Sequence, residues 1–349
     1  MKNKIKDMLI PVLAVFIALI IGAGIIGYLG ENPLNAYYYL FTGAFVGQRA
    51  IARTLLEATP MIFTGLSVLF AFKAGMFNIG GQGQVIMGGL IAAAVGAFVK
   101  NAGVSNVFVI LILAGAAGFA WAAIAGFLKA KLGVHEVIST IMLNYIAMNF
   151  EQYALNYPLK AGGPSGPSPQ TPPVFESARL VQLMPHTREA FNVGFIVAII
   201  AVIAVWFIME KTILGYEIKA VGNNPTAAEN AGINVSWITA LSLGLAGSLA
   251  ALGGAERILG GVGQYTYRQG IMASYGFDGI AVALLGKNHP VGAVLSAILF
   301  ASLRVGGRSM QFNTSVPSQI VIILQAIIIL LIAAENMFKV VLDRKKVSE

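Results

Sequence analysis

Long apolar segments separated by short polar connections make up most of this chain. The segments run for roughly 15–22 residues, which is the length an α-helix needs to cross the hydrocarbon core of a bilayer. The expected spans are residues 8–29, 51–72, 77–99, 107–128, 134–153, 192–209, 237–254, 272–286, 290–303 and 316–334. The pattern predicts a single all-α polytopic membrane domain of about ten transmembrane helices over residues 1–349. Two halves of five spans each are a further hypothesis, which no residue-level repeat supports.

Three connections differ from the short ones. Residues 31–47 are rich in aromatic side chains, and Tyr37 to Tyr39 suit a membrane interface. Residues 155–190 contain GGPSGPSPQTPP and no sustained apolar run, which predicts a long, partly extended extracytoplasmic loop. Residues 257–269 contain glycine and tyrosine and are expected to form a loop after the seventh span.

The connection 210–235 is the longest polar stretch that lies between two strongly apolar segments. Asn224 suits an N-cap, Pro225 the first helical position, and Gly232 the residue after a helix end. These signals predict a short helix over residues 226–231, with a flat face of small alanines. Such a helix between two spans has a shape that can dock into a groove on another protein, and the alternative is an ordinary interhelical loop.

Composition places the protein in the membrane. The chain is 57% hydrophobic and 11% charged, with a mean hydropathy of +0.78, whereas soluble domains carry about 25% charged residues. The net charge of +8 is better explained by loops facing an anionic leaflet of membrane lipid than by nucleic-acid binding. Lysines near the N-terminus and the basic run Asp343–Lys346 predict that both termini are cytosolic.

Polar residues interrupt two of the spans. The third span begins with three glycines and three amide side chains between Asn78 and Gln84, and the eighth contains Gly276–Phe277–Asp278–Gly279. Glycine-interrupted segments at corresponding positions of two halves are a sequence pointer to a transport pathway. We expect the pathway residues Asn78, Gln82, Gln84, Phe277 and Asp278. For four further polar residues in or near spans a structural hydrogen-bonding role is expected ahead of a substrate role: Glu57, Glu136, Asn144 and Glu151.

Motifs for catalysis are missing from the sequence. There is no cysteine, the three histidines are far apart, and no HExxH occurs, so a metal site is not expected. No GxxxxGK[ST] occurs, so the chain is not expected to bind ATP itself or to act as an enzyme. A membrane pathway, a docking helix and no nucleotide site together suggest a transporter subunit driven by a partner. A secondary transporter driven by an ion gradient through Asp278 or Glu57, and a channel, are the alternatives.

Four blocks of sequence resemble permease subunits of ATP-binding-cassette importers for nucleosides and simple sugars. They read FTGLSVLFAFKAGMFNIGGQGQ (63–84), HEVISTIMLNYIA (135–147), LGYEIKAVGNNPTAAENAGIN (214–234) and YGFDGIAVALLGKNHPVGA (275–293), and they occur in the family's order. The resemblance covers residues 53–306, and the blocks FNIGGQGQ and MLNYIA look closer to the nucleoside branch than to the ribose branch.

The resemblance implies roles for individual residues. The segment 214–232 corresponds to the cytosolic coupling loop that contacts the ATPase, and its matching positions are Gly215, Lys219, Gly222, Asn224, Pro225, Ala228 and Gly232. The family often has Arg at position 219, so Lys219 keeps the charge but loses the planar fork. The family usually has Glu at position 82, and the neutral amide of Gln82 argues against proton carriage there.

The resemblance also implies an assembly in the plasma membrane. A cytosolic ATP-binding subunit would carry ATP and Mg, and no cofactor is expected in this chain. A second permease chain, different from this one, would complete the passage, and an extracytoplasmic lipoprotein would deliver the cargo. Nucleosides are the expected cargo. A simple-sugar permease is the nearer alternative and an ion-coupled transporter the more distant one.

Overall fold

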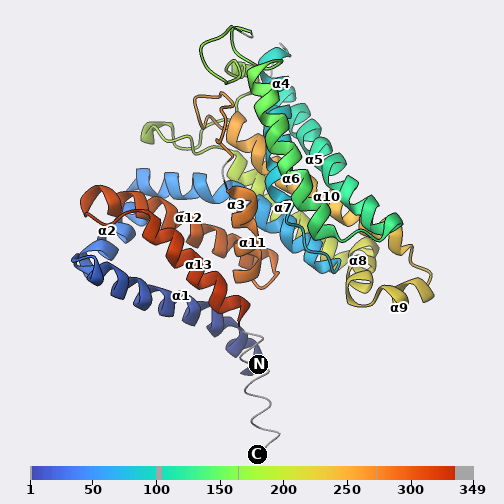
Figure 1. Ribbon diagram of the computed structural model, residues 1–349, viewed down its shortest axis with the longest axis horizontal. Coiled ribbons are helices and arrows are strands. Elements are labelled where there is room, and N and C mark those ends of the chain that lie inside the picture. Colours follow the sequence, from blue (N-terminus) through green and yellow to red (C-terminus); the bar gives the residue numbers. More distant parts are fainter. Residues whose placement is uncertain (1, 100–103, 164, 273, 335–349) are drawn as a thin grey trace, which may run out of the picture. The chain divides into compact units, whose positions relative to one another are not determined.

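The computed structural model describes residues 2–99, 104–163, 165–272 and 274–334, and in these ranges the regular structure is helical (Figure 1). The helices are α1 (Lys2–Tyr28), α2 (Pro33–Phe45), α3 (Gln48–Lys73), α4 (Gly81–Phe98), α5 (Val104–Leu132), α6 (Glu136–Asn156), α7 (Gly194–Lys211), α8 (Ile213–Asn223), α9 (Pro225–Asn230), α10 (Val235–Leu259), α11 (Tyr275–Leu285), α12 (Pro290–Asn313) and α13 (Gln319–Ala333). Two short 3₁₀ turns cover Glu176–Ala178 and Pro185–Thr187.

Each of the ten predicted spans coincides with one of these helices. Seven helices among the described residues are long and apolar enough to cross a membrane, and α11 and α13 are shorter apolar helices. This confirms a polytopic α-helical membrane protein. The basic run Asp343–Lys346, which entered the prediction of sidedness, lies outside the described residues.

Contacts divide the chain into two compact units, residues 1–54 with 298–349, and residues 55–297. In the first unit, α1 packs along α13, and the Tyr37 hydroxyl of α2 donates a hydrogen bond of 2.6 Å to the Leu19 carbonyl. Helices α2 and α12 touch backbone to backbone, because a Cβ on Gly306 would lie 2.1 Å from the Leu40 carbonyl oxygen.

Two sequence expectations in this unit are wrong. Residues 31–47 are not a connection but contain α2. Asn32 caps this helix and Pro33 begins it. Its buried residues, spaced by four, are Ala36, Leu40 and Ala44. The ninth span does not end at residue 303, since α12 continues to Asn313. In α2 and at the end of α12, small or apolar residues at helical spacing favour a helix, although polar and aromatic residues lie between them.

The second unit is built around α10, which packs against α4 and α5. Glycines set these crossings, because they let helix backbones approach closely. A Cβ on Gly247 would lie 2.3 Å from the Gly118 carbonyl oxygen, and one on Gly88 would lie 2.0 Å from that of Ala251. The Ser248 hydroxyl adds a hydrogen bond of 2.9 Å to the Gly115 carbonyl.

Residues 171–180 of the long loop between α6 and α7 are hydrogen-bonded to the end of α10 and to the connection between α10 and α11. Backbone amides of Thr171, Val174 and Leu180 donate to carbonyls of Tyr267, Tyr265 and Leu259, at 3.0, 2.9 and 2.8 Å. The guanidinium of Arg179 lies over the Tyr265 ring, 4.2 Å from its centroid. Residues 171–180 of the loop are therefore held against the end of α10 and the segment that follows it.

Candidate functional site

The expected docking segment forms two helices, α8 and α9. Asn224 joins them in an extended conformation, and its side-chain oxygen accepts from the Ala227 amide at 3.1 Å, as an N-cap should. Pro225 occupies the first helical position, and Gly232 after α9 has φ of +83°, which favours glycine. These features confirm the predicted short helix. Helix α8 was not predicted, although Ile218 and Val221 bury one face of it at the spacing of a helix.

Two glycines fix α8 against the rest of its unit. A Cβ on Gly215 would lie 2.1 Å from the Ile208 carbonyl oxygen of α7, and a Cβ on Gly222 would lie 2.3 Å from that of Lys73 at the end of α3. Thr212 caps α8 by accepting from the Gly215 amide at 3.1 Å. Helix α8 therefore stands in backbone contact with the ends of two spans.

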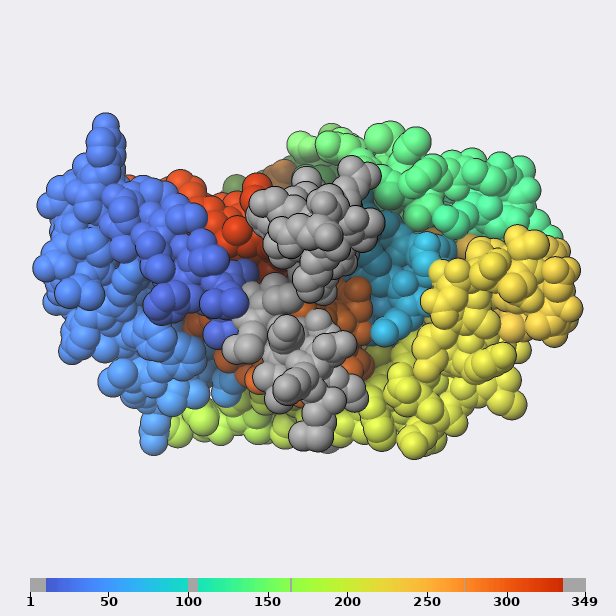
Figure 2. All heavy atoms as spheres, turned by 90° about the horizontal axis from the view of Figure 1, so that it is seen from below, coloured from blue at the N-terminus to red at the C-terminus, as the bar shows by residue number. Residues whose placement is uncertain are grey.

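The other positions that match the coupling-loop pattern differ in how far their side chains are exposed to solvent. Asn224, Pro225 and Gly232 are exposed, Lys219 is half-buried, and Ala228 is buried. The ammonium of Lys219 lies 3.3 Å from the Glu210 carboxylate. The space-filling view shows the segment of α8 and α9, in yellow, at the surface (Figure 2). The segment thus presents an exposed, capped turn next to a helix that backbone contacts hold in place.

The three amides expected in a pathway are buried and bonded. Asn78 donates to the Gln84 side-chain oxygen at 3.0 Å, and Gln84 donates back at 3.1 Å. Asn78 also donates to the Ser67 hydroxyl of α3 at 3.2 Å. The α4 helix begins at Gly81 and not at Asn78, so Asn78 lies in the extended connection and caps its own turn by accepting from the Gly80 amide at 3.0 Å.

Gln82 connects α4 to the start of α11. Its amide nitrogen donates to the Met272 carbonyl at 2.8 Å, and its oxygen accepts from the Gly276 amide at 3.0 Å. The backbones touch here, because a Cβ on Gly276 would lie 2.1 Å from the Gln82 nitrogen. Phe277 in the first turn of α11 is exposed, and Asp278 is half-buried and accepts from the Ser274 hydroxyl at 3.2 Å. All five expected pathway residues thus belong to one crossing of α4 and α11 or its flanks; their role in transport stays a prediction.

A buried charged cluster was missed in part. The expected loop 257–269 begins too early, since α10 runs to Leu259 and buries both Glu256 and Arg257. Arg257 lies 3.9 Å from the Glu57 carboxylate of α3 and over the Tyr275 ring, 4.7 Å from its centroid. The Tyr275 hydroxyl donates to Glu57. The signal was available, because an acid such as Glu57 inside an apolar run requires a partner.

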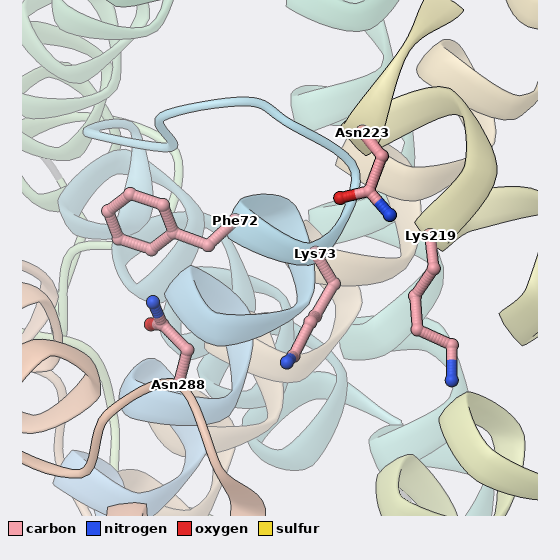
Figure 3. Close-up of a pocket in the computed structure, with 6 residues that line it drawn as sticks. Phe72, Lys73, Lys219, Asn223 and Asn288 are labelled. Carbon is pink, nitrogen blue, oxygen red and sulfur yellow. The ribbon is translucent and has the colours of Figure 1, made fainter. Parts of the chain in front are cut away.

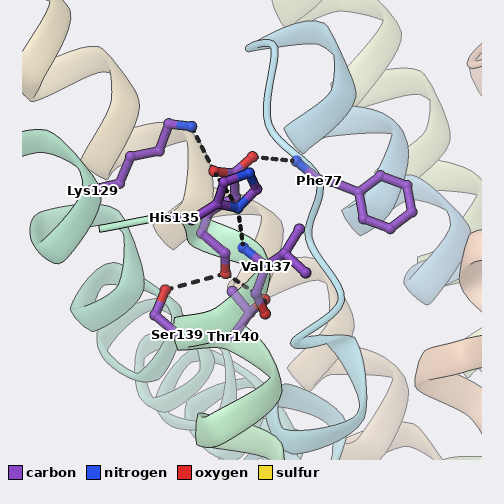
Figure 4. A network of polar contacts seen from close by, with 7 residues as sticks. Phe77, Lys129, His135, Val137, Ser139 and Thr140 are labelled. Atoms are coloured by element: carbon purple, nitrogen blue, oxygen red, sulfur yellow. Dashed lines mark hydrogen bonds and ion pairs between the residues drawn. The ribbon is translucent and has the colours of Figure 1, made fainter. Parts of the chain in front are cut away.

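Glu136 at the start of α6 holds three segments together (Figure 4). One carboxylate oxygen accepts from Lys129 at the end of α5, at 2.6 Å, and the other accepts from the Phe77 amide between α3 and α4, at 3.3 Å. Its carbonyl accepts from the Thr140 hydroxyl at 2.7 Å. These contacts give Glu136 the structural role that the sequence indicated.

Comparison with known proteins decides the family. Residues 50–333 match the family described as the permease component of the branched-chain amino acid transport system. The chain belongs to this permease family. No solved structure matches it.

Three relatives cover almost the full length of this permease. It is 37% identical to a guanosine ABC transporter permease of Bacillus subtilis, over 99% of both chains, and 36% identical to a nucleoside ABC transporter permease of Lactococcus lactis, over 99% of this chain and 96% of the relative. A glucose ABC transporter permease of Haloferax volcanii is 35% identical, over 94% and 88%. A second guanosine ABC transporter permease of the same Bacillus is 27% identical, over 77% and 85%.

Proposed function

We propose that this chain is the membrane-spanning permease subunit of an ATP-driven importer that translocates nucleosides. The observation that carries the proposal is the full-length identity of 37% and 36% to the guanosine and nucleoside permeases. The family's printed description concerns branched-chain amino acids, but relatives that match nearly end to end are the better guide to cargo.

The energy for transport would come from a cytosolic ATP-binding subunit that carries ATP and Mg. The exposed turn at Asn224 and Pro225 is the surface we propose for its contact. A movement imposed there would reach α3 through the backbone contact of Gly222 with Lys73. From the end of α3 the chain leads directly to Asn78 and the crossing of α4 with α11. Packed elements that touch backbone to backbone move together, so this sequence of contacts supports coupling.

The passage itself would lie along the crossing of α4 and α11. The amides of Asn78, Gln82 and Gln84 are taken up by one another and by backbone groups, so in this conformation they hold the crossing closed. Phe277 and Asp278 offer an aromatic face and a carboxylate beside it, and a nucleoside has a base that stacks and hydroxyls that donate. We propose that opening of the crossing exposes the amides to the cargo.

Two further partners complete the proposed importer. A second, different permease chain is supported by the two guanosine permeases of one Bacillus, which both match this chain. An extracytoplasmic substrate-binding lipoprotein would deliver the nucleoside to the side that carries the loop 155–190. On this proposal both termini and the α8–α9 segment face the cytosol.

The experiment is uptake by proteoliposomes that contain the permease pair and the ATP-binding subunit, with the binding protein outside and ATP inside. Radiolabelled guanosine, uridine, glucose, ribose and leucine are compared at equal concentration. We expect ATP-dependent uptake of the nucleosides. Uptake of leucine alone, or nucleoside uptake that requires an ion gradient and not ATP, would overturn the proposal.

A simple-sugar permease is the second candidate, since the glucose permease of Haloferax volcanii is 35% identical to the chain. The same experiment separates the two, because glucose or ribose would then enter with ATP and the nucleosides would not.

A further inference from the structure

A polar hollow lies beside the α8–α9 segment, with a volume of about 350 Å³ (Figure 3). Three parts of the chain line it: the end of α3, the second half of α8, and the connection between α11 and α12. Its lining residues are Phe72, Lys73, Lys219, Gly222, Asn223 and Asn288. In Figure 3 the Lys73 side chain extends between Asn288 on one side and Lys219 on the other.

Local geometry keeps this space open. The backbone of Gly222 packs directly on Lys73 and Gly75. No side chain of α8 therefore lies between α8 and the end of α3 at this point. Asn288 has φ of +51° in the turn after α11, and its side chain lines the hollow. The ring of Phe72 is held aside by an edge-on contact with Phe77, at 5.0 Å between centroids.

The hollow is positively charged and lacks an acid of its own. Its lining contains two lysines and no carboxylate. Lys219 lies 3.3 Å from Glu210, which does not line the hollow. The side-chain ammonium of Lys73 makes no hydrogen bond or ion pair with any residue that the structure describes. A lysine ammonium has three donors to satisfy. Asn223 and Asn288 each add an amide nitrogen that donates and an oxygen that accepts, and the Asn288 oxygen is buried without a hydrogen-bond partner.

We propose that this hollow receives a carboxylate side chain of the cytosolic ATP-binding subunit, with Lys73 as its principal partner. The inference rests on the proposed function and extends the contact beyond α8 and α9 to the end of α3. Charge complementarity indicates an acidic group, and continuity with the exposed turn at Asn224 indicates the protein that supplies it. A carboxylate in the hollow would lie between α3 and α8. The partner would therefore bind where Gly222 packs against the end of α3.

The test uses the complete importer with Lys73→Glu, Lys73→Gln and a matched control, Lys131→Glu. Lys131 is exposed at the end of α5, and this end is next to the start of α10, where Ser236 donates to the Ala130 carbonyl at 3.3 Å. We expect Lys73→Glu to lower the affinity for the ATP-binding subunit about tenfold or more, and Lys73→Gln to lower it less. The control should stay at the wild-type value, and all variants should reach the membrane in equal amounts.

A zero-length carboxyl-to-amine cross-linker locates the occupant. We expect a cross-link between Lys73 and one acidic residue of the ATP-binding subunit, and exchange of that acid for lysine should restore binding to Lys73→Glu. Equal affinities of the Lys73 and Lys131 variants would overturn the proposal. So would an effect of Lys73→Glu seen only in vesicles with anionic phospholipid and not in phosphatidylcholine, which would assign the hollow to a lipid headgroup.

Failure of this inference is distinguishable from failure of the proposed function. A wild-type chain that binds the ATP-binding subunit and imports nucleosides, with a Lys73→Glu variant that does the same, removes only the inference. A wild-type chain that neither binds that subunit nor imports with ATP removes both.

Discussion

Asn78 and Gln84 are polar side chains in an apolar part of the chain, and each occupies the hydrogen-bonding groups of the other. Both are buried. An amide buried without partners costs about 1–3 kcal/mol, so the pair is stable only while both members are present. Because the two amides already bond each other, neither is available to bind a substrate in this conformation.

Replacing Asn78 with leucine should therefore destabilise the protein by about 1–3 kcal/mol, because Gln84 and Ser67 lose their partner. Nucleoside uptake should fall while the ATP-binding subunit stays attached. Thermal unfolding in detergent, uptake and co-purification measure the three effects. Asn149→Leu is the control, since Asn149 is exposed and bonds only within its own helix. An unfolding temperature equal to that of the control would contradict the argument.

Gly222 is a second position where a small change of side chain is expected to impair transport. Gly222→Ala places a methyl group 2.3 Å from the Lys73 carbonyl oxygen, and overpacking of this kind costs about 1–3 kcal/mol. We expect nucleoside uptake to fall because α8 is displaced from α3. Gly24→Ala is the control, since a Cβ there meets nothing within 4 Å. Equal uptake by the two variants would show that the contact carries no coupling.

Among the elements, α10 extends beyond the end that its sequence indicates. Residues 255–259 follow two glycines and include two charges, so a span was expected to end at residue 254. The helix continues because Arg257 has Glu57 and the Tyr275 ring as partners. These partners come from α3 and α11, far away in sequence, and no local pattern contains them. The ion pair thus connects three helices of the second unit.

Breaking this pair on one side should cost more than removing both charges. Arg257→Gln leaves Glu57 buried beside the tyrosine, and a buried charge that loses its partner costs about 3–5 kcal/mol. Glu57→Gln combined with Arg257→Gln should recover part of that loss. A double-mutant cycle on thermal stability measures the coupling. Additive effects of the two substitutions would mean that the two side chains do not interact.

A feature can be predicted from the sequence when the residues that form it are close together along the chain. The helices and the cap at Asn224 depend on neighbours within a few residues, and these predictions were confirmed. Helix α2 was missed because its tyrosines also suit an interface. The joints at Gly222 with Lys73 and Gly276 with Gln82 depend on contacts between distant segments. The amides of 78–84 were recognised as unusual, but their mutual bonding is visible only in three dimensions.

For the molecule as a whole, the proposed function requires the loop 155–190 and the α8–α9 segment on opposite sides of the membrane. Since α7 lies between them and is one of the seven apolar helices, a single crossing separates them. The proposed sidedness places the loop outside, at the delivery site of the cargo. The α8–α9 segment then faces the ATP-binding subunit.

The absence of cysteine from the chain makes this arrangement directly measurable. We expect Ser165→Cys, at an exposed position of the loop, to react with a membrane-impermeant maleimide on intact cells. Thr226→Cys, exposed in α9, should react only after permeabilisation, and the cysteine-free parent supplies the background. The reverse pattern would invert the topology, and labelling of both sites on intact cells would place them on one side.

The pinned loop between α6 and α7 has a practical consequence for raising reagents against this protein. Thr171 and Tyr267 are 96 residues apart in sequence yet exchange hydrogen bonds, and both are buried, so the loop conformation that they hold exists only in the folded chain. An antibody selected against it would recognise a conformational epitope and fail on a denatured blot. Synthetic peptides from the proline-rich stretch would elicit antibodies to a shape that the native transporter does not display.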